Sequence, residues 1–470
     1  MKHARILIAA PASGTGKTLI TCGILSCLKE RNMEVTAFKC GPDYIDPMFH
    51  KEVLEINSYN LDTFLCGRDG VREILAKHIE AASSERKSIA VIEGVMGYYD
   101  GLGGISTEAS AYDVADATDT PVVLLIDCKG LSVSVVPVLK GFLSYKEKRR
   151  DKSHVSGVIL NRLSPGMYGR MKALIERETS VKVYGYVPVL KESFLESRYL
   201  GLQMPHEKAG AREQLKNFGM KLSETVDIDG LIELSANAPK LPCGTCAEGK
   251  DGLYDGVRIG IAADEAFCFC YQDNLEYLER LGARLVPFSP LRDARLPEHI
   301  HGLIFYGGYP ELYAEQLAAN HSMRTCVKAA IDGGIPCIAE CGGFLYLQER
   351  LEGKDKQMHS MAGVFAGGSR KMERLQRFGY LTLTGGKVFG RDVGELQAHE
   401  FHYYDSEECG SAFTVKKPLS DRTWECMIST DTILAGYPHF HYLGNKKMAA
   451  AFLEAAQKKR SEDLKKREEK

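Results

Sequence analysis

The fold of the N-terminal half is decided by the stretch Ala9-Ala10-Pro11-Ala12-Ser13-Gly14-Thr15-Gly16-Lys17-Thr18, which follows an apolar run and precedes a helical pattern. Its two glycines permit a tight turn whose backbone amides face an anion, Lys17 adds a positive charge, and the hydroxyl of Thr18 can ligate Mg²⁺. Pro11 stands where the GxxxxGK(S/T) pattern has its first glycine. We interpret the stretch as a phosphate-binding loop, with an ordinary strand-to-helix turn as the alternative.

Length and composition limit the number of domains and the class of protein to which such a loop could belong. A chain of 470 residues is too long for one core and predicts two or three domains. A hydrophobic fraction of 44% and a charged fraction of 26% are typical of a soluble globular protein, and a net charge of −2 argues against a nucleic-acid surface. The sequence contains no apolar run long enough to span a membrane, and its 14 cysteines are scattered as in reduced proteins. We therefore expect a cytoplasmic protein without a nucleic-acid or membrane partner.

Short apolar runs alternate with helical patterns through the first half. These runs are continuously apolar, as expected when helices cover both faces of a parallel sheet. The pattern predicts a doubly wound α/β domain, whose ligands collect beyond the carboxyl ends of its strands. The expected strands are residues 5–10, 35–39, 89–93, 122–127, 155–161 and 183–187.

Acidic residues follow two of these expected strands. Asp43 and Asp46 lie in residues 39–50, and Glu93 opens residues 93–101. Mg²⁺ prefers carboxylate, hydroxyl and phosphate oxygens, so Thr18, Asp46 and Glu93 are candidates for one metal site. As an alternative, Asp43 and Asp46 cap turns by accepting bonds from nearby amides.

The motifs together resemble one family. They are the GTGKT loop, Gly-Pro-Asp-Tyr-Ile-Asp-Pro at 41–47, Asn60-Leu61-Asp62 and Glu-Gly-Val-Met-Gly at 93–97. This combination is similar to the cobyrinic acid a,c-diamide synthase family, which belongs with the dethiobiotin-synthetase-like P-loop ATPases. The resemblance implies that a substrate carboxylate attacks the γ-phosphate of ATP, and that ammonia displaces the resulting acyl phosphate.

The resemblance also implies roles for single residues. Asp100 acts at the substrate carboxylate, and Asn161 contacts the adenine edge; a polar residue that caps the strand end is the alternative for Asn161. The implied ATP and Mg²⁺ ligands are Gly14, Thr15, Gly16, Lys17 and Thr18 for the nucleotide, and Thr18, Asp46 and Glu93 for the metal.

A composition change divides the chain. Prolines and glycines interrupt any periodicity in residues 236–256, so we expect a linker between an ATP-binding domain (1–235) and a second domain (257–450), with a charged tail at 451–470. Cys243 and Cys246 in the linker form a CxxC without a second pair, which favours incidental thiols over a zinc site.

A second α/β unit carries a candidate nucleophile. The apolar run 335–340 ends directly before Cys341-Gly342-Gly343, and a helical pattern follows, as in a nucleophile elbow. The glycine turn at 306–311 offers backbone amides for an oxyanion. A buried cysteine that packs as a small apolar side chain is the alternative.

The second unit also resembles a known domain. Ala-Glu-Cys-Gly-Gly at 339–343 and Tyr-Gly-Gly-Tyr-Pro at 306–310 are similar to the class I, triad-type glutamine amidotransferase domain of the same synthases. That resemblance implies Cys341 as nucleophile and His439 as base, with His402 as a rival base. Other triad amidotransferases have a glutamate where this chain has His441, so the third triad member stays open.

The two halves together predict a glutamine-dependent ligase. The resemblance implies amidation of the a and c acetates of cobyrinic acid in cobalamin biosynthesis, with ATP, L-glutamine and a corrinoid tetrapyrrole as substrates, by a monomer or homodimer. Nickel sirohydrochlorin, the substrate of a relative in coenzyme F430 biosynthesis, is the alternative. A partition-type P-loop ATPase is the alternative from another class, and it would leave Cys341 without a role.

Overall fold

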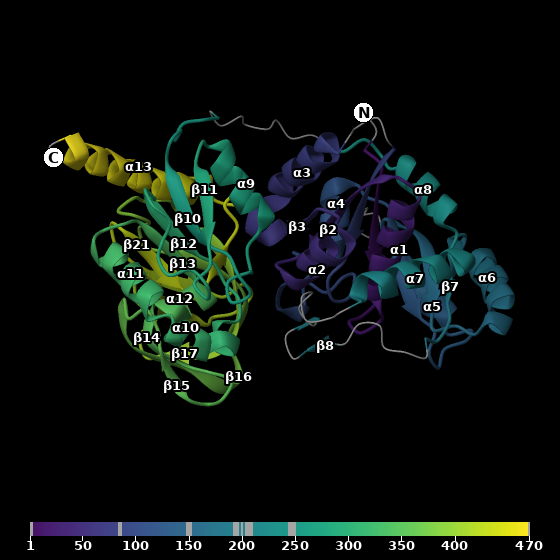
Figure 1. Cartoon of the computed structure of the whole chain (residues 1–470). Coiled ribbons are helices and arrows are strands. Elements are labelled where there is room, and N and C mark those ends of the chain that lie inside the picture. Colours follow the sequence, from purple (N-terminus) through teal and green to yellow (C-terminus); the bar gives the residue numbers. More distant parts are fainter. Residues whose placement is uncertain are drawn as a thin grey trace. The chain divides into compact units, whose positions relative to one another are not determined.

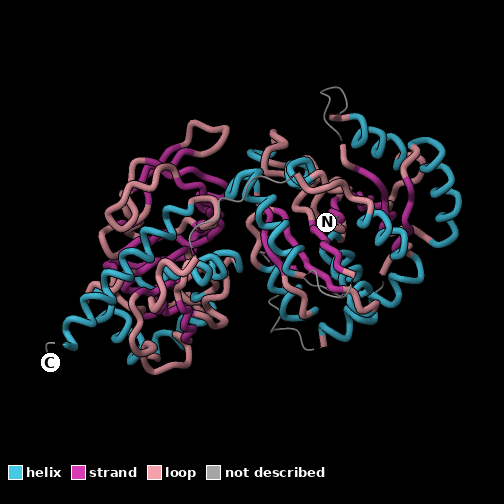
Figure 2. The backbone as a smooth tube through the Cα atoms, turned by 90° about the horizontal axis from the view of Figure 1, so that it is seen from above, coloured by secondary structure: helices cyan, strands magenta, loops and turns pink. Residues whose placement is uncertain are grey.

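The computed structural model describes residues 3–82, 87–146, 153–190, 197–198, 201–202, 210–242 and 251–468 (Figure 1). The chain forms two compact units, residues 1–246 and 247–470, so the division falls inside the expected linker. The CxxC pair of that linker lies outside the described residues. Strands and helices alternate along most of the chain, which confirms the α/β fold class (Figure 2).

The N-terminal unit is built on one parallel sheet of seven strands. Their order is β3 (Ser58–Leu61), β2 (Glu34–Cys40), β4 (Ser88–Glu93), β1 (Arg5–Ala9), β5 (Val122–Asp127), β6 (Val155–Asn161) and β7 (Lys182–Val187). All six expected strands are present. The seventh, β3, was not predicted because it is short and carries Ser58 and Asn60 among its four residues.

Helices cover both faces of this sheet. Apolar side chains of α1, α2, α7 and α8 form one buried cluster with side chains such as Ile6 and Ala37 of the strands. Phe38 points to the other face, where its ring contacts that of His78 on α3 at 6.4 Å between centroids. The helices of the unit are α1 (Lys17–Glu30), α2 (Ile45–Leu54), α3 (Thr63–Ala81), α4 (Ala111–Thr118), α5 (Val135–Ser144), α6 (Pro165–Thr179), α7 (Ala211–Thr225) and α8 (Ile228–Ala236).

The C-terminal unit holds a second parallel sheet, with one antiparallel strand at its edge. The strand order is β11 (Arg284–Phe288), β10 (Arg258–Ala262), β12 (Gly302–Phe305), β13 (Cys337–Glu340), β21 (Ile433–Gly436) and β20 (Ile428–Ser429). Its helices are α9 (Gln272–Arg280), α10 (Ala314–Ala319), α11 (His321–Asp332), α12 (Gly342–Leu347) and α13 (Lys446–Glu468).

A further, largely antiparallel sheet in this unit was not predicted. Its path is β15 (Met358–Ser360), β14 (Gln348–Glu352), β16 (Phe365–Thr384), β17 (Leu396–Ser406) and β22 (His439–Phe440), and β18 (Phe413–Lys416) with β19 (Thr423–Cys426) pairs beside β16. Much of β16 is exposed and its register shifts against β17, so the sequence shows no regular alternation there. Strand β22 of this sheet carries His439, the base that the resemblance implies.

The charged tail is shorter than expected. Helix α13 begins at Lys446, and its apolar side chains up to Ala456 are buried in the core of the C-terminal unit, among them Phe452 and Leu453. This apolar face was not predicted, because alanines such as Ala449 make up much of it and give a weak apolar pattern among the charged residues. None of the described helices is long and apolar enough to cross a membrane.

Candidate active sites

The phosphate loop joins β1 to α1. Gly16 adopts φ 87° directly before the helix, a conformation that glycine reaches without strain. A Cβ at this position would lie 3.0 Å from the amide nitrogen of Asn161, which in turn donates a hydrogen bond to the carbonyl of Thr15 at 2.7 Å. Asn161 at the end of β6 therefore braces the loop.

Lys17 points its ammonium at backbone carbonyls. Its Nζ donates to Met96 O at 2.5 Å and to Ala12 O at 3.1 Å. Burial, together with the charge of Lys39, lowers the pKa of Lys17 to about 8. A phosphate at this position would favour the charged form further, because it would add a negative charge to those of Glu93, Asp100 and Asp46.

The three expected metal ligands lie together. The hydroxyl of Thr18 donates to Glu93 Oε1 at 2.6 Å and lies 3.4 Å from Asp46 Oδ2. They come from the start of α1, the first turn of α2 and the end of β4. A hydroxyl and two carboxylates beside a phosphate loop are a donor set that fits Mg²⁺.

Lys39, at the end of β2, forms ion pairs with both carboxylates of this set. Its Nζ lies 2.8 Å from Glu93 Oε1 and also contacts Asp46. Burial opposes the charge of Lys39, but the two carboxylates outweigh burial and raise its pKa. Burial opposes the charge of Glu93, but Lys39 and His50 favour its carboxylate form and lower its pKa. The pKa of Asp46 is raised, by burial and by the charge of Asp43. The cluster is a buried network of opposite charges.

Asp100 belongs to the same end of the sheet. Its side chain is exposed, and Oδ2 accepts a hydrogen bond from the Gly97 amide at 2.9 Å. This bond stabilises the turn that also presents the carbonyl of Met96 to Lys17.

In the C-terminal unit, Cys341 occupies a sharp turn between β13 and α12. Its backbone has φ 47° and ψ −102°, a conformation that costs about 1–3 kcal/mol for a residue with a side chain. Two backbone bonds hold it, from Cys341 N to Gly436 O at 2.8 Å and from Leu345 N to Cys341 O at 2.9 Å. The thiol-bearing residue is only 7% exposed.

The two glycines after Cys341 are required by close packing. A Cβ at Gly343 would lie 2.1 Å from the carbonyl oxygen of Phe305, and one at Gly342 would lie 2.9 Å from the backbone nitrogen of Gly308. The elbow therefore packs directly on the glycine turn that follows β12. The backbone nitrogen of Gly308 thus lies close to the elbow, where a donor could stabilise an oxyanion.

His439 lies beside the elbow. A Cβ at Gly307 would lie 2.5 Å from the imidazole Cε1, so the ring packs on that glycine. The imidazole Nδ1 is 3.5 Å from Glu340 Oε2. Burial opposes the charged form of His439, but charge and hydrogen-bond contacts with Cys341 and Glu340 outweigh burial and raise its pKa to about 10. Cys341 and His439 are therefore in contact, the arrangement in which a histidine can activate a cysteine nucleophile.

Comparison with known proteins supports both halves. Residues 6–198 match the CobQ/CobB/MinD/ParA nucleotide binding domain, and residues 258–447 match the CobB/CobQ-like glutamine amidotransferase domain. The cobyrinate a,c-diamide synthase of Priestia megaterium is 36% identical over 469 residues, which cover 98% of this chain and 99% of that protein. The enzyme of the same name from Listeria innocua serovar 6a is 38% identical over 449 residues, covering 94% and 97%.

The chain belongs to the cobyrinate a,c-diamide synthase family. The predicted resemblance is thus confirmed, and the chain is a ligase with a nucleotide-binding domain and a glutamine amidotransferase domain.

The structure distinguishes between the alternatives left open for this family member. Asp43 is a cap, because its Oδ1 accepts bonds from the amides of Ile45 and Asp46. The side chain of Asp46 is instead directed to Thr18 and Lys39.

The rival base, His402, is engaged elsewhere. Its Nδ1 lies 2.6 Å from Tyr404 O, its Nε2 lies 3.4 Å from Glu400, and its ring stacks on Tyr437 at 3.8 Å between centroids. Both ring nitrogens of His402 therefore have a neighbour among residues of its own strand.

Sequence reasoning missed three residues at these sites of the synthase fold. Lys39 is the last residue but one of β2, and Glu340 is the last residue of β13; a charged residue at such a position in a buried strand was the available signal. Asn274 is fully buried and bonds both Phe440 O and Tyr442 N at 2.8 Å, so it fixes the backbone after His439. Nothing in the local sequence marks Asn274, because its partners are more than 160 residues away.

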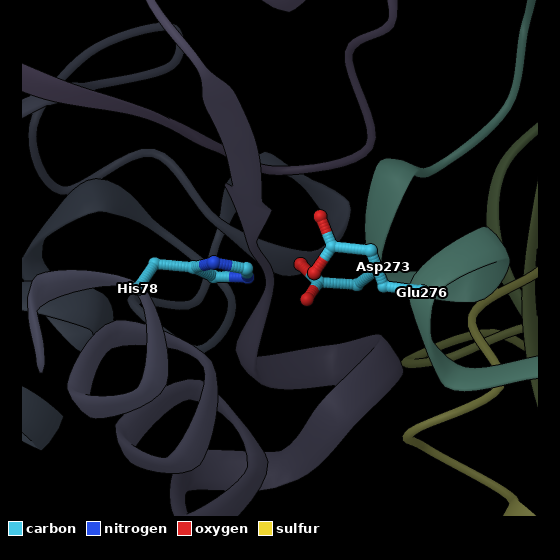
Figure 3. Close-up of side chains that lie close together, drawn as sticks. All are labelled: His78, Asp273 and Glu276. Atoms are coloured by element: carbon cyan, nitrogen blue, oxygen red, sulfur yellow. The ribbon is translucent and has the colours of Figure 1, made fainter. Parts of the chain in front are cut away.

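Figure 3 shows three side chains of types that ligate metals, His78 of α3 and Asp273 and Glu276 of α9. His78 belongs to the N-terminal unit and the two carboxylates to the C-terminal unit, so we assign them no common site.

Proposed function

We propose that the protein amidates the a and c acetate carboxylates of cobyrinic acid, with ATP and glutamine as co-substrates. The observation that carries this proposal is the match over nearly the whole chain to synthases of that name. The contacts of Thr18 with Glu93 and of His439 with Cys341 support it. We also propose that it works in the cytoplasm, in keeping with its many free cysteines.

In the N-terminal unit, a substrate carboxylate oxygen attacks the γ-phosphorus of ATP, and ADP leaves with the electrons of the broken P–O bond. Lys17 and the amides of the phosphate loop bind the phosphates, Asn161 lies at the adenine edge, and Asp100 orients the substrate. Thr18, Asp46 and Glu93 would hold Mg²⁺, which supplies charge stabilisation to the transferring phosphoryl group. Ammonia then attacks the acyl carbon, and phosphate leaves.

In the C-terminal unit, the Cys341 thiolate attacks the side-chain amide carbon of glutamine. His439 donates a proton to the departing nitrogen, so that ammonia leaves as a thioester forms. His439 then takes a proton from water, and the resulting hydroxide attacks the thioester carbon. Glutamate is released, and the sulfur of Cys341 leaves as the thiolate beside protonated His439.

The test uses purified full-length protein with ATP, Mg²⁺ and either cobyrinic acid or nickel sirohydrochlorin. Glutamine or ammonium chloride supplies the nitrogen, and mass spectrometry counts the amides formed. We expect the wild-type protein to form two amides on the corrinoid with either nitrogen source. The Cys341→Ser variant should form them with ammonium chloride but not with glutamine. Preference for the nickel tetrapyrrole would contradict the substrate assignment, and loss of both nitrogen sources in Cys341→Ser would contradict the division of labour between the units.

A further inference from the structure

The carboxylate that faces His439 comes from the residue directly before the nucleophile. Glu340 ends β13, and its Oε2 is 3.5 Å from His439 Nδ1. Both side chains are buried, with 2% and 3% of their surface exposed. A carboxylate beside an imidazole attracts its charged form more strongly when both are buried, because little water screens the two charges.

Separate elements hold the two partners in place. Glu340 lies in the parallel sheet, where its Cα pairs with Gly436, whereas His439 pairs with His399 in the antiparallel sheet. Asn274 fixes the chain just beyond His439. Burial raises the pKa of Glu340, whereas His439 and the backbone of Phe440 act in the opposite direction and favour its charged form. The contact is thus set by the tertiary structure rather than by a flexible turn.

The other candidates for this role are unsuitable. His441 stands where other triad amidotransferases have a glutamate, but it packs against the Tyr271 ring at 5.0 Å and cannot supply a negative charge. Glu400, the acidic residue nearest to the rival His402, lies 3.4 Å from His402 and 3.9 Å from Arg377.

We propose that Glu340 is the positioning carboxylate of the Cys341–His439 pair, and so completes the amidotransferase triad from the position preceding the nucleophile. It accepts the Nδ1 proton of His439, which leaves the other ring nitrogen to serve Cys341, and its charge stabilises the imidazolium. Glu340 does not exchange a proton with substrate. This inference rests on the proposed glutaminase function of the C-terminal unit.

Several other titratable groups surround this pair and bear on its pH dependence. Cys341 raises the pKa of His439, and His399 on β17 is held neutral by burial, with its pKa lowered to about 3. Tyr306 and Tyr442 lie near Glu340, and burial raises the pKa of both phenols. Cys341 and Glu340 are therefore the two groups whose contacts favour the charged form of His439.

The experiment compares Glu340→Gln and Glu340→Asp in the full-length protein, with His441→Gln as a control that alters a neighbouring buried side chain. Glutaminase kcat and KM are measured against pH. Glu340→Gln should lower kcat by about tenfold or more, leave KM for glutamine nearly unchanged and move the alkaline limb of kcat/KM to lower pH, since the imidazolium loses its counterion. Glu340→Asp should keep the alkaline limb and retain more activity, and His441→Gln should keep the wild-type limb.

A double-mutant cycle tests whether Glu340 acts through His439. The readout is the rate at which 6-diazo-5-oxo-L-norleucine, a glutamine analogue, labels Cys341. Adding Glu340→Gln to His439→Ala should slow labelling no further. If Glu340→Gln does not fold, NMR of the imidazole nitrogens of wild-type His439 carries the test, and an imidazolium is expected at pH 8.

The proposal is overturned if Glu340→Gln keeps the wild-type kcat and pH profile, or if it is as active as Glu340→Asp. It is also overturned if the losses in the double-mutant cycle are additive, or if His439 is neutral at pH 8. Any of these, with Cys341 still essential, would leave the proposed function intact. Wild-type protein that forms no glutamate from glutamine would overturn both.

Discussion

The phosphate loop and the cysteine elbow both follow a buried parallel strand, yet they position their chemistry differently. At Gly14 of the phosphate loop, a Cβ would have no atom within 4 Å, and the nearby order comes from the ion pairs among Lys39, Asp46 and Glu93. At the elbow, a Cβ on Gly343 would lie 2.1 Å from a backbone oxygen. A Cβ at Gly16 would lie 3.0 Å from Asn161 Nδ2, so the first site combines charge with steric contacts, whereas the second depends mainly on steric packing. The two should therefore respond to different mutations.

The largest expected effect is on the charge-organised site. Asp46→Asn and Glu93→Gln each remove a charge from the metal set, and should lower amidation from glutamine and from ammonium chloride alike by about 10²–10³-fold. Asp43→Asn is the matched control, because asparagine can still cap α2 through the same acceptor position. Normal amidation by both metal-set variants would show that Thr18, Asp46 and Glu93 do not hold the metal.

A smaller effect should separate the elbow from the loop. Gly343→Ala should lower the free energy of unfolding of the C-terminal unit by about 3 kcal/mol and impair glutaminase activity, because the new methyl group overlaps Phe305 O. Gly14→Ala has space around it and should cost only about 1 kcal/mol, from its φ of 72°. Denaturant unfolding and glutaminase assays measure both, and equal losses would contradict the contrast between steric and charge-based order.

The smallest effect concerns Lys17 in the ligand-free protein. The pKa of Lys17 in the folded protein, about 8, is below the ordinary value of 10.5, so burial of the charged amine destabilises the folded state. This destabilisation is fully present below pH 8 and decreases as the pH rises toward 10.5. The stability of Lys17→Met relative to wild type should therefore fall by about 1–2 kcal/mol between pH 7.5 and pH 10. Urea unfolding of both proteins at several pH values checks this, and a constant difference would mean that the pKa of Lys17 is not lowered.

Much of the architecture follows from patterns within short windows. Continuous apolar runs predicted six strands of the N-terminal sheet, since strands covered on both faces need apolar residues at successive positions. Strand β3 and the sheet around β16 were not predicted, because polar and exposed residues interrupt their apolar pattern and their stability depends on neighbouring strands.

The candidate sites divide in the same way. The sequence by itself determined the GTGKT loop, the carboxylates at 46 and 93 and the Cys-Gly-Gly elbow, because turn geometry and strand ends leave local signals. Only the tertiary structure decided that Lys39 contacts both carboxylates, that His402 is engaged by its own neighbours, and that Glu340 faces His439. The physical reason is that these contacts join residues from different strands and sheets, whose approach is set by the packing of the whole unit rather than by local sequence.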